Sequence, residues 1–244
     1  MERELEYWRG SPAERPDAFT LVHKLSEGLV LLEAIERHRP RFERRQTILE
    51  LGGGQGWAAC LVKSMFDSTV IASDISTEAI ATVPGWERLI DVSLDGALAC
   101  PSFDIPLDDE TVDLVFTFQA AHHFGAHRRT LAEAWRLLRP GGSVLYLQEP
   151  TSPEWIYPRA VARVNRKRAG YGHEVVEDVL VPSRLLEIGR SLGFEASLSY
   201  APTPTLRGPT EFLYYIVLGK LKPLQHWLPC TADLVFEKPP AGVR

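Results

Sequence analysis

The sequence predicts an α/β fold in which helices cover both faces of an open, mostly parallel sheet. Short apolar segments alternate along the chain with segments of helical periodicity, which is typical of βαβ units. Several of these segments are apolar at almost every position, as expected for parallel strands buried on both faces. The first of them, 47–51, runs directly into a glycine-rich loop. With 244 residues, 45% of them hydrophobic, the chain can bury the core of one such domain.

The N-terminal half supplies a helix and then the first βαβ units. Residues up to about 45 are expected to be helical because apolar side chains recur at spacings of three and four. These side chains are Leu21, Leu25, Leu29, Leu32 and Ile35. After the glycine loop we expect a helix, a strand at 69–72 that leads to Asp74, and a short helix capped by Ser76. The stretch 84–106 is the least regular and holds a third strand at 96–100.

The C-terminal half continues the alternation, interrupted from 150 to 181 by a stretch that mixes charged and aromatic residues. The expected strands are 114–118, 143–148, 194–200 and 231–237, and the expected helices are 126–138, 182–193 and 208–222. Gly193 ends its helix with the residue type favoured just beyond a helix. The chain therefore contains seven expected strands.

The glycine loop is the first candidate binding site. Four of the five residues 52–56 are glycines, so the backbone can approach a ligand where any Cβ would collide. The helix that follows offers free N–H groups suited to a carboxylate or phosphate. Glu50 precedes the loop, and the Asp74 carboxylate can accept hydrogen bonds from two ribose hydroxyls. Because ligands of open parallel sheets bind beyond the carboxyl ends of the strands, a nucleotide-like ligand is expected here.

These residues alone leave a dinucleotide possible. The segment GQGWAA at 54–59 matches the pattern G-x-G-x-x-A. Its first glycine, however, comes three residues after the strand, whereas in a dinucleotide-binding fold the first glycine follows the strand directly. The loop by itself does not choose between the two kinds of ligand.

Several ordered motifs resemble those of the class I S-adenosylmethionine-dependent methyltransferases, in particular the ubiquinone/menaquinone-type methyltransferase 11 group. The matching segments are ILELGGGQG at 48–56, IPLDDETVDLV at 105–115, AAHHF at 120–124, LLRPGG at 137–142 and LVFEK at 234–238. They are similar to the family's motif I and to its LPFxDxSFDLV, ALHHL, VLKPGG and final-strand segments. Asp74 falls where the ribose-binding acid of the family lies. The resemblance favours S-adenosylmethionine over a dinucleotide.

The resemblance implies a Rossmann-like, seven-stranded, mostly parallel sheet with an antiparallel last strand and helices on both faces, together with added N-terminal helices and a lid segment. We expect a single methyltransferase domain over 1–244. Its expected parts are an N-terminal helical cap (1–45), a cofactor-binding core (46–150), a lid and acceptor segment (151–181) and the C-terminal part of the core (182–244), which includes the inserted helix 208–222.

The implied function is methyl transfer from S-adenosylmethionine to an O, N or C nucleophile of a small-molecule acceptor. The residues expected to bind the cofactor are Glu50, Gly52, Gly53, Gly54, Gln55, Gly56, Asp74, Ile75, Ser102, Phe103 and Gln119. One departure concerns adenine, because the family often has GDA where this chain has Cys100, Pro101 and Ser102. Ser102, the Phe103 backbone or Asp104 is then expected to hold adenine in place of the missing acid.

The candidate catalytic residues lie at the ends of two strands. His122 or His123 could act as a general base or orient the acceptor, or both could instead order loops through hydrogen bonds. Glu149 could bind the acceptor or cap the next turn. A basic run follows at Arg159, Arg163, Arg166, Lys167 and Arg168. A solvated helix face is the favoured interpretation of that run, and an anionic acceptor is the alternative.

Composition limits the partners. A net charge of −5 gives no overall basic footprint for nucleic acid. Three dispersed cysteines without a CxxC pair predict neither a disulfide framework nor a metal site. The absence of an apolar run of about 18 residues, or of a signal peptide, predicts a cytoplasmic protein. A homodimer through 208–222 remains open. The alternative functions are a non-catalytic S-adenosylmethionine-binding or partner-binding protein and, less favoured, an NAD-dependent oxidoreductase.

Overall fold

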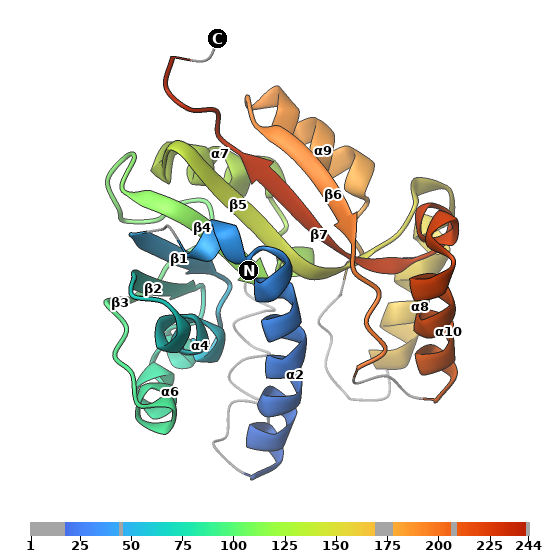
Figure 1. The fold of residues 1–244 in the computed structure, drawn as a ribbon, viewed down its shortest axis with the longest axis horizontal. Coiled ribbons are helices and arrows are strands. Elements are labelled where there is room, and N and C mark those ends of the chain that lie inside the picture. The colour runs from blue at the N-terminus through green and yellow to red at the C-terminus, as the bar shows by residue number, and fades with distance from the viewer. Residues whose placement is uncertain (1–17, 44–45, 169–177, 206–208, 243–244) are drawn as a thin grey trace.

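The computed structural model describes residues 18–43, 46–168, 178–205 and 209–242, and its centre is a single seven-stranded sheet (Figure 1). The strands are β1 (Thr47–Leu51), β2 (Thr69–Asp74), β3 (Gly96–Ala99), β4 (Val112–Phe118), β5 (Leu138–Thr151), β6 (Glu195–Tyr200) and β7 (Cys230–Glu237). Their order is β3-β2-β1-β4-β5-β7-β6, and β7 runs antiparallel to both of its neighbours. The predicted sheet with its antiparallel last strand is confirmed.

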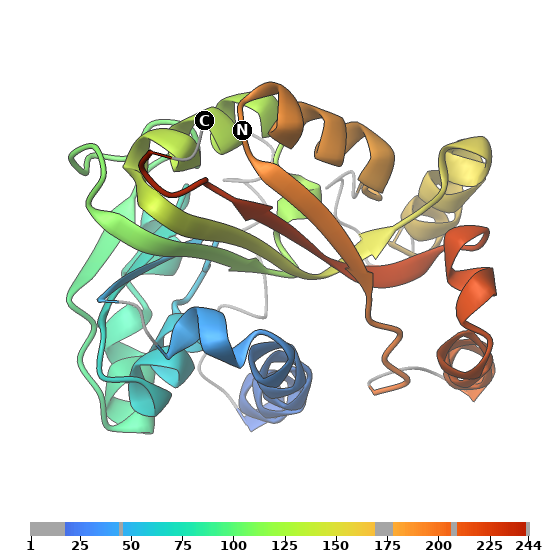
Figure 2. The same ribbon diagram turned by 45° about the horizontal axis from the view of Figure 1, so that its top comes forward.

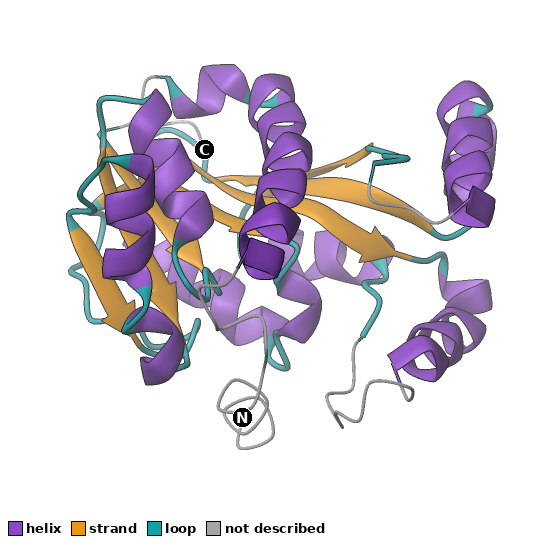
Figure 3. Ribbon diagram, turned by 90° about the horizontal axis from the view of Figure 1, so that it is seen from below, coloured by secondary structure: helices purple, strands orange, loops and turns teal. Residues whose placement is uncertain are grey.

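Helices cover both faces of this sheet, which Figure 3 shows in purple around the orange strands. The helices are α2 (Ala18–Arg37), α3 (Arg39–Phe42), α4 (Trp57–Met65), α5 (Thr77–Ile80), α6 (Val83–Ile90), α7 (His127–Leu137), α8 (Tyr157–Arg168), α9 (Pro182–Ser191) and α10 (Pro209–Lys220). Short 3-10 turns in the described part of the chain are η2 (Ala121–His123), η3 (Glu154–Ile156) and η5 (Lys222–His226). In Figure 2, α2, α4 and α6 lie below the sheet, and α7 and α9 lie above it.

The core follows the alternation of side chains along each strand. On β1, Ile48 packs toward α2 and α4, and its neighbour Leu49 packs toward the opposite cluster beneath α7 and α9. This two-sided burial explains why the central strands are apolar at nearly every position.

Two regions differ from the sequence prediction, and a third agrees with only part of it. Leu25 and Leu29, expected on the buried stripe of the first helix, are 63% and 59% exposed, whereas Ile35 is buried as expected and shares the buried face with Val30, Leu31 and Ala34. The stretch 84–106 contains the unpredicted α6, which starts with a proline in its first turn, a favoured position. The segment 151–181 contains the helix α8, on which Arg159, Arg163 and Arg166 are exposed, in agreement with the solvated helix face favoured for the basic run. Apolar periodicity did not reveal this helix, because only Ala160 of its described side chains is buried.

Parts of two predicted segments, residues 1–17 of the cap and 169–177 of the lid, lie outside the described residues. Among the described helices, none is both long and apolar enough to cross a membrane. The cytoplasmic location and the homodimer stay predictions.

Candidate active site

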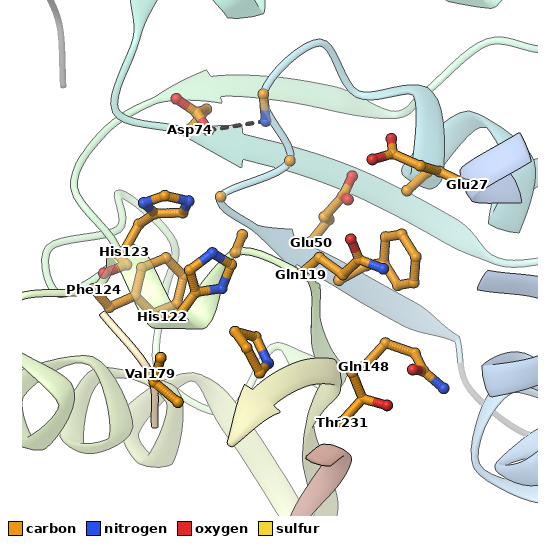
Figure 4. A pocket seen from close by; sticks show the side chains of 18 of the residues that line it. Glu27, Glu50, Asp74, Gln119, His122, His123, Phe124, Gln148, Val179 and Thr231 are labelled. Atoms are coloured by element: carbon orange, nitrogen blue, oxygen red, sulfur yellow. Dashed lines mark hydrogen bonds between the residues drawn. The ribbon is translucent and has the colours of Figure 1, made fainter. Parts of the chain in front are cut away.

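A cavity of about 800 Å³ lies beyond the carboxyl ends of β1, β2, β4 and β5 (Figure 4). We call its two parts the cofactor end and the acceptor end. The cofactor end is lined by Glu50, the loop 52–55, Asp74, Ile75 and residues 100–103. The acceptor end is lined by residues of α8 and α10, by Val179 and by residues 229–231. His122, His123 and Gln119 lie on the wall of the same cavity.

The glycine loop has the backbone that its sequence predicts. Gly52 and Gly54 have φ angles of +66° and +54°, in the left-handed region that favours glycine. A Cβ at Gly53 would come within 2.6 Å of a carboxylate oxygen of Glu50. Gly56 is different, because it caps α4 and faces Val83 rather than the cavity. Ten of the eleven predicted cofactor residues therefore line the cavity, and Gly56 does not.

Two buried carboxylates flank this loop. Asp74 accepts a hydrogen bond of 2.8 Å from the backbone N–H of Gly54 and another of 2.8 Å from that of Ser76. Burial raises the pKa of Asp74 above its usual value. Glu50 accepts from the Ala59 N–H at 3.0 Å, and burial, with the nearby charge of Asp74, raises its pKa to about 8. A cation in the cavity would favour the ionised form of Glu50.

The adenine side of the cofactor end differs from the expectation. Ser102 lines the cavity, but its hydroxyl is hydrogen-bonded to that of Thr130 at 2.8 Å. Phe103 also lines it, and the Arg129 guanidinium lies 3.8 Å from its ring centroid. Asp104, the third candidate, is not among the lining residues. The Ser102 side chain is thus already occupied within the protein.

Glu149 lies behind the cavity wall rather than beside the acceptor space. Its fully buried carboxylate accepts backbone N–H groups from Ala120, Ala121 and His122 at 2.9–3.2 Å, and it lies 2.8 Å from Nδ1 of His122. This corrects the idea that Glu149 contacts the acceptor and agrees with the alternative, a cap on the following turn. The cap orients a ring that does line the cavity (Figure 4).

A bulge in β5 brings Glu149 to that position. The β5–β7 register shifts between Tyr146 and Glu149, and Gln148 has a φ of +56°, unusual for a residue other than glycine. The N–H of Gln148 donates instead to the Asp233 carboxylate at 2.8 Å. Asp233 is fully buried and also pairs with Arg37 at 2.9 Å.

Sequence reasoning missed Asp233. The signal available was a single acidic residue within the apolar strand ADLVF at 232–236. A buried carboxylate needs partners, so an acid at such a position indicates a hydrogen-bonding role. Its partners, however, lie far away in the sequence, on α2 and at the bulge in β5, and no local sequence pattern predicts these contacts. In the described residues, no group of three or more His, Cys, Asp or Glu side chains could hold a metal ion.

Residues 49–146 match the sequence model of a family described as a methyltransferase domain. The matched segment includes most of the glycine loop's strand, Asp74 and both histidines. The chain carries a class I methyltransferase domain. The predicted family and its cofactor, S-adenosylmethionine, are confirmed.

Curated relatives agree over the same region. A protein of Mycolicibacterium smegmatis named a probable S-adenosylmethionine-dependent methyltransferase is 34% identical over 98 residues, 40% of this chain and 36% of that protein. The phthiotriol/phenolphthiotriol dimycocerosates methyltransferase of Mycobacterium tuberculosis is 29% identical over 118 residues, 45% of this chain and 43% of that protein. The matches thus span less than half the length of these relatives.

Solved structures extend the likeness in fold to nearly the whole chain. The geranyl diphosphate C-methyltransferase of Streptomyces coelicolor, crystallised with Mg²⁺, geranyl diphosphate and S-adenosyl-L-homocysteine, has a TM-score of 0.69. The identity is 12%, and 97% of each chain is covered. A likeness at this identity concerns the fold.

The cofactor end fits S-adenosylmethionine on its own geometry. A Cβ at Gly52 would press against Phe124, and a Cβ at Gly53 would collide with Glu50, so the absence of side chains here keeps this part of the cavity open. Two carboxylates, Glu50 and Asp74, supply acceptors for ribose hydroxyls and for an ammonium group. The residues present therefore suit a cationic nucleoside.

Proposed function

We propose that this chain transfers the methyl group of S-adenosylmethionine to an oxygen or nitrogen nucleophile of a small-molecule acceptor, with His122 accepting the proton that the nucleophile loses. The observation that carries the proposal is the 2.8 Å contact between His122 Nδ1 and the buried Glu149 carboxylate. A carbon nucleophile that must lose a proton would use His122 in the same way.

The contact with Glu149 selects the tautomer of His122. Both carboxylate oxygens already accept backbone N–H groups, so Glu149 acts as an acceptor and Nδ1 carries the hydrogen. The neutral ring then has its lone pair on Nε2, which has no hydrogen-bond partner among the described residues. A proton accepted there creates a cationic ring beside Glu149, which stabilises it, and such a base contributes about 10²–10⁴-fold.

The cofactor residues follow from the geometry of the cofactor end. When bound, S-adenosylmethionine supplies a methyl group on positively charged sulfur, already activated for in-line displacement. We assign the ribose hydroxyls to Asp74 and the ammonium group to Glu50. Gln119, with a φ of +51° at the end of β4, contacts the methionine portion. Ile75 and the backbone at 102–103 hold adenine, because the Ser102 hydroxyl is bonded elsewhere.

The acceptor end supports a partly apolar acceptor. Ala160 and Val164 of α8, Val179, and Tyr215 of α10 all line it. The Mycobacterium tuberculosis relative is named for phthiotriol dimycocerosates, and the Streptomyces structure contained geranyl diphosphate. We infer that the acceptor of this chain also carries an apolar portion.

Calorimetry with S-adenosyl-L-homocysteine, followed by a methyl-transfer assay over a broad acceptor panel, tests this function. We expect binding and transfer to at least one acceptor, with the transfer rate lowered in His122→Ala and binding unchanged. Binding without transfer to any member of the panel would favour the alternative of a non-catalytic S-adenosylmethionine-binding protein. Preferential thermal stabilisation by NAD would favour the oxidoreductase.

A further inference from the structure

The helix α2 brings a lysine and a glutamate to the wall of the cavity. Lys24 and Glu27 both line the cavity, and Lys24 Nζ donates a hydrogen bond of 2.9 Å to the Glu27 carboxylate. These two positions continue the buried face of α2, on which Leu31 and Ala34 follow at helical spacing. The same face of the helix is therefore apolar where it packs in the core and charged where it lines the cavity.

Lys24 lies near the cofactor end. Its Nζ is 5.5 Å from the centroid of the Trp57 ring, which belongs to the first residue of α4. Burial raises the pKa of Glu50, and the nearby charge of Lys24 lowers it. Figure 4 shows Glu27, the partner of Lys24, on the same side of the cavity as Glu50. The Lys24 side chain is only 20% exposed, so its charge is partly removed from solvent.

The other charged side chains of the cofactor end are carboxylates, those of Glu27, Glu50 and Asp74. Among the described residues that line the cavity, Arg163 is the one other lysine or arginine, and it belongs to the acceptor end. The methionine portion of S-adenosylmethionine carries a carboxylate beside its ammonium group. Three protein carboxylates would repel that group, so it needs a cation where it binds.

The glycine loop and the start of α4 do not offer the free N–H groups that the sequence predicted for an anion. The N–H groups of Gly54 and Ala59 both donate to buried carboxylates of the protein, at 2.8 and 3.0 Å. Those of Gly53 and Gly56 donate to backbone carbonyls at 2.9 Å. The Lys24 ammonium can donate three hydrogen bonds, so it can hold a second carboxylate in addition to its present partner.

We propose, on the basis of the ammonium site that the proposed function assigns to Glu50, that Lys24 binds the carboxylate of the methionine portion of the cofactor. The site of the cofactor then extends to a helix outside the matched segment 49–146. The other end of α2 is fixed to the sheet by the pairing of Arg37 with the buried Asp233 at 2.9 Å. Binding of the carboxylate by Lys24 does not depend on the proton-accepting step.

The test is calorimetry of the full chain with two ligands. One is S-adenosyl-L-homocysteine, and the other is its decarboxylated analogue, which keeps the ammonium group and lacks the carboxylate. Lys24→Met keeps an unbranched side chain and removes the charge. We expect this variant to bind S-adenosyl-L-homocysteine about tenfold more weakly than the wild type does, with unchanged affinity for the analogue. Lys24→Arg, which keeps the charge, should lose less affinity than Lys24→Met.

Lys63→Met is the matched control. Lys63 of α4 also pairs with a carboxylate, that of Asp95 at 2.7 Å, and its side chain is 24% exposed, but it does not line the cavity. Both ligands should bind this variant as they bind the wild type, and melting temperatures show whether all variants fold. An equal loss of affinity in Lys63→Met would overturn the proposal.

Two further outcomes would also overturn it. One is an unchanged affinity for S-adenosyl-L-homocysteine in Lys24→Met, because the lysine would then serve only its pairing with Glu27. The other is an equal loss for both ligands, because that result assigns Lys24 to the shape of the site and not to the carboxylate. Binding that follows the prediction without methyl transfer to any acceptor would contradict the proposed function and leave the role of Lys24 standing.

Discussion

The cofactor end of the cavity is built from backbone groups and buried carboxylates at the ends of strands, whereas the acceptor end is built mainly from side chains on two helices. At the cofactor end, Asp74 is held by two backbone N–H groups. At the acceptor end, the ion pair joining α8 to α10 involves an Arg163 side chain that is 60% exposed. The first arrangement is fixed by the sheet, and the second can vary without disturbing it.

The family match follows the same division. Residues 49–146 contain nearly all of the cofactor end, but α8 and α10 lie beyond them. Proteins that bind the same cofactor need the same geometry at the cofactor end, whereas proteins that bind different acceptors need different side chains around the acceptor end. The comparison therefore predicts large, specific effects for changes at the strand ends and small ones for changes on the acceptor helices.

The largest effect is expected at His122, where the two ends meet. His122→Ala should lower kcat for an accepted hydroxyl or amine acceptor by about 10³-fold, because it removes the base. The dissociation constant for S-adenosyl-L-homocysteine should stay the same. The measurement is steady-state kinetics together with calorimetry, with His123→Ala as the control for the neighbouring ring. A loss of less than threefold would remove His122 from the mechanism.

The cofactor end should show a pH dependence set by Glu50. Its raised pKa means that the cavity without cofactor holds a proton up to about pH 8, whereas the cationic cofactor favours the ionised carboxylate. Affinity should then rise by up to about tenfold per pH unit below pH 8 and level off above it. Calorimetry in two buffers of different ionisation enthalpy would detect the released proton, and Glu50→Gln should flatten the profile.

The same shift predicts how the stability of the protein without cofactor changes with pH. The pKa of Glu50 rises from a usual value of 4.5 to about 8 on folding, so the folded state binds a proton that the unfolded state releases. The contribution is fully present below about pH 4.5 and is lost as pH rises through 8. Denaturant titrations of wild type and Glu50→Gln across this range measure it. If the free energy of unfolding of the wild type, relative to Glu50→Gln, increased as pH rises, the predicted sign of this pH dependence would be wrong.

A smaller effect is expected where Asp233 supports the bulge. Asp233→Asn weakens the pairing with Arg37 and loosens the Gln148 backbone that leads to Glu149. We expect kcat to fall about tenfold, with KM for the cofactor unchanged. ¹⁵N shifts of the His122 ring should show a mixture of tautomers, which a purely structural role would not produce.

Asp113→Asn is the matched control for that variant. Asp113 also accepts a backbone N–H of a neighbouring strand, from Thr47 at 2.9 Å, and pairs with an arginine, Arg139, at 2.8 Å. It lies at the opposite end of the strands from the cavity. Its substitution should lower stability while leaving the His122 tautomer and kcat unchanged. Similar kinetic losses in both variants would assign the Asp233 effect to general destabilisation.

The smallest effect is expected at the acceptor end. Arg163→Ala and Glu211→Ala should couple by less than about 1 kcal/mol in a double-mutant cycle of unfolding, because the Arg163 side chain is 60% exposed to solvent. Each should change KM for the acceptor more than KM for the cofactor. A coupling energy of several kcal/mol would show that the acceptor end is as rigidly built as the cofactor end.

The sequence predicted most of the residues that line the cofactor end of the cavity, because the patterns that indicate them are local. The glycines at 52–56 and Asp74 each follow directly after a short apolar strand, so a short stretch of sequence indicates their backbone conformation and their place at the strand ends. Short apolar segments likewise predicted all seven strands. Gly56 was misplaced because a left-handed glycine can serve packing, here against Val83, as well as a ligand.

The rest depended on long-range contacts. The sequence left two roles for Glu149, acceptor binding and capping of the next turn. Its actual position depends on the bulge in β5 and on Asp233, which lies 84 positions further along the chain. Only the basic run indicated the helix α8, as a solvated face, because its described side chains are mostly exposed and leave no apolar stripe for periodicity to detect. In the same way, Leu25 and Leu29 repeat at helical spacing but face away from the sheet.

The most direct test of the account is calorimetric titration of the purified chain with S-adenosyl-L-homocysteine, because it needs no acceptor. We predict binding to the wild type and at least about a thirtyfold weaker affinity in Asp74→Ala, which removes charge-assisted hydrogen bonds to the ribose. The Asp113→Asn variant should bind like the wild type. No binding at millimolar ligand, or equal affinity in Asp74→Ala, would contradict the assignment of the cofactor end.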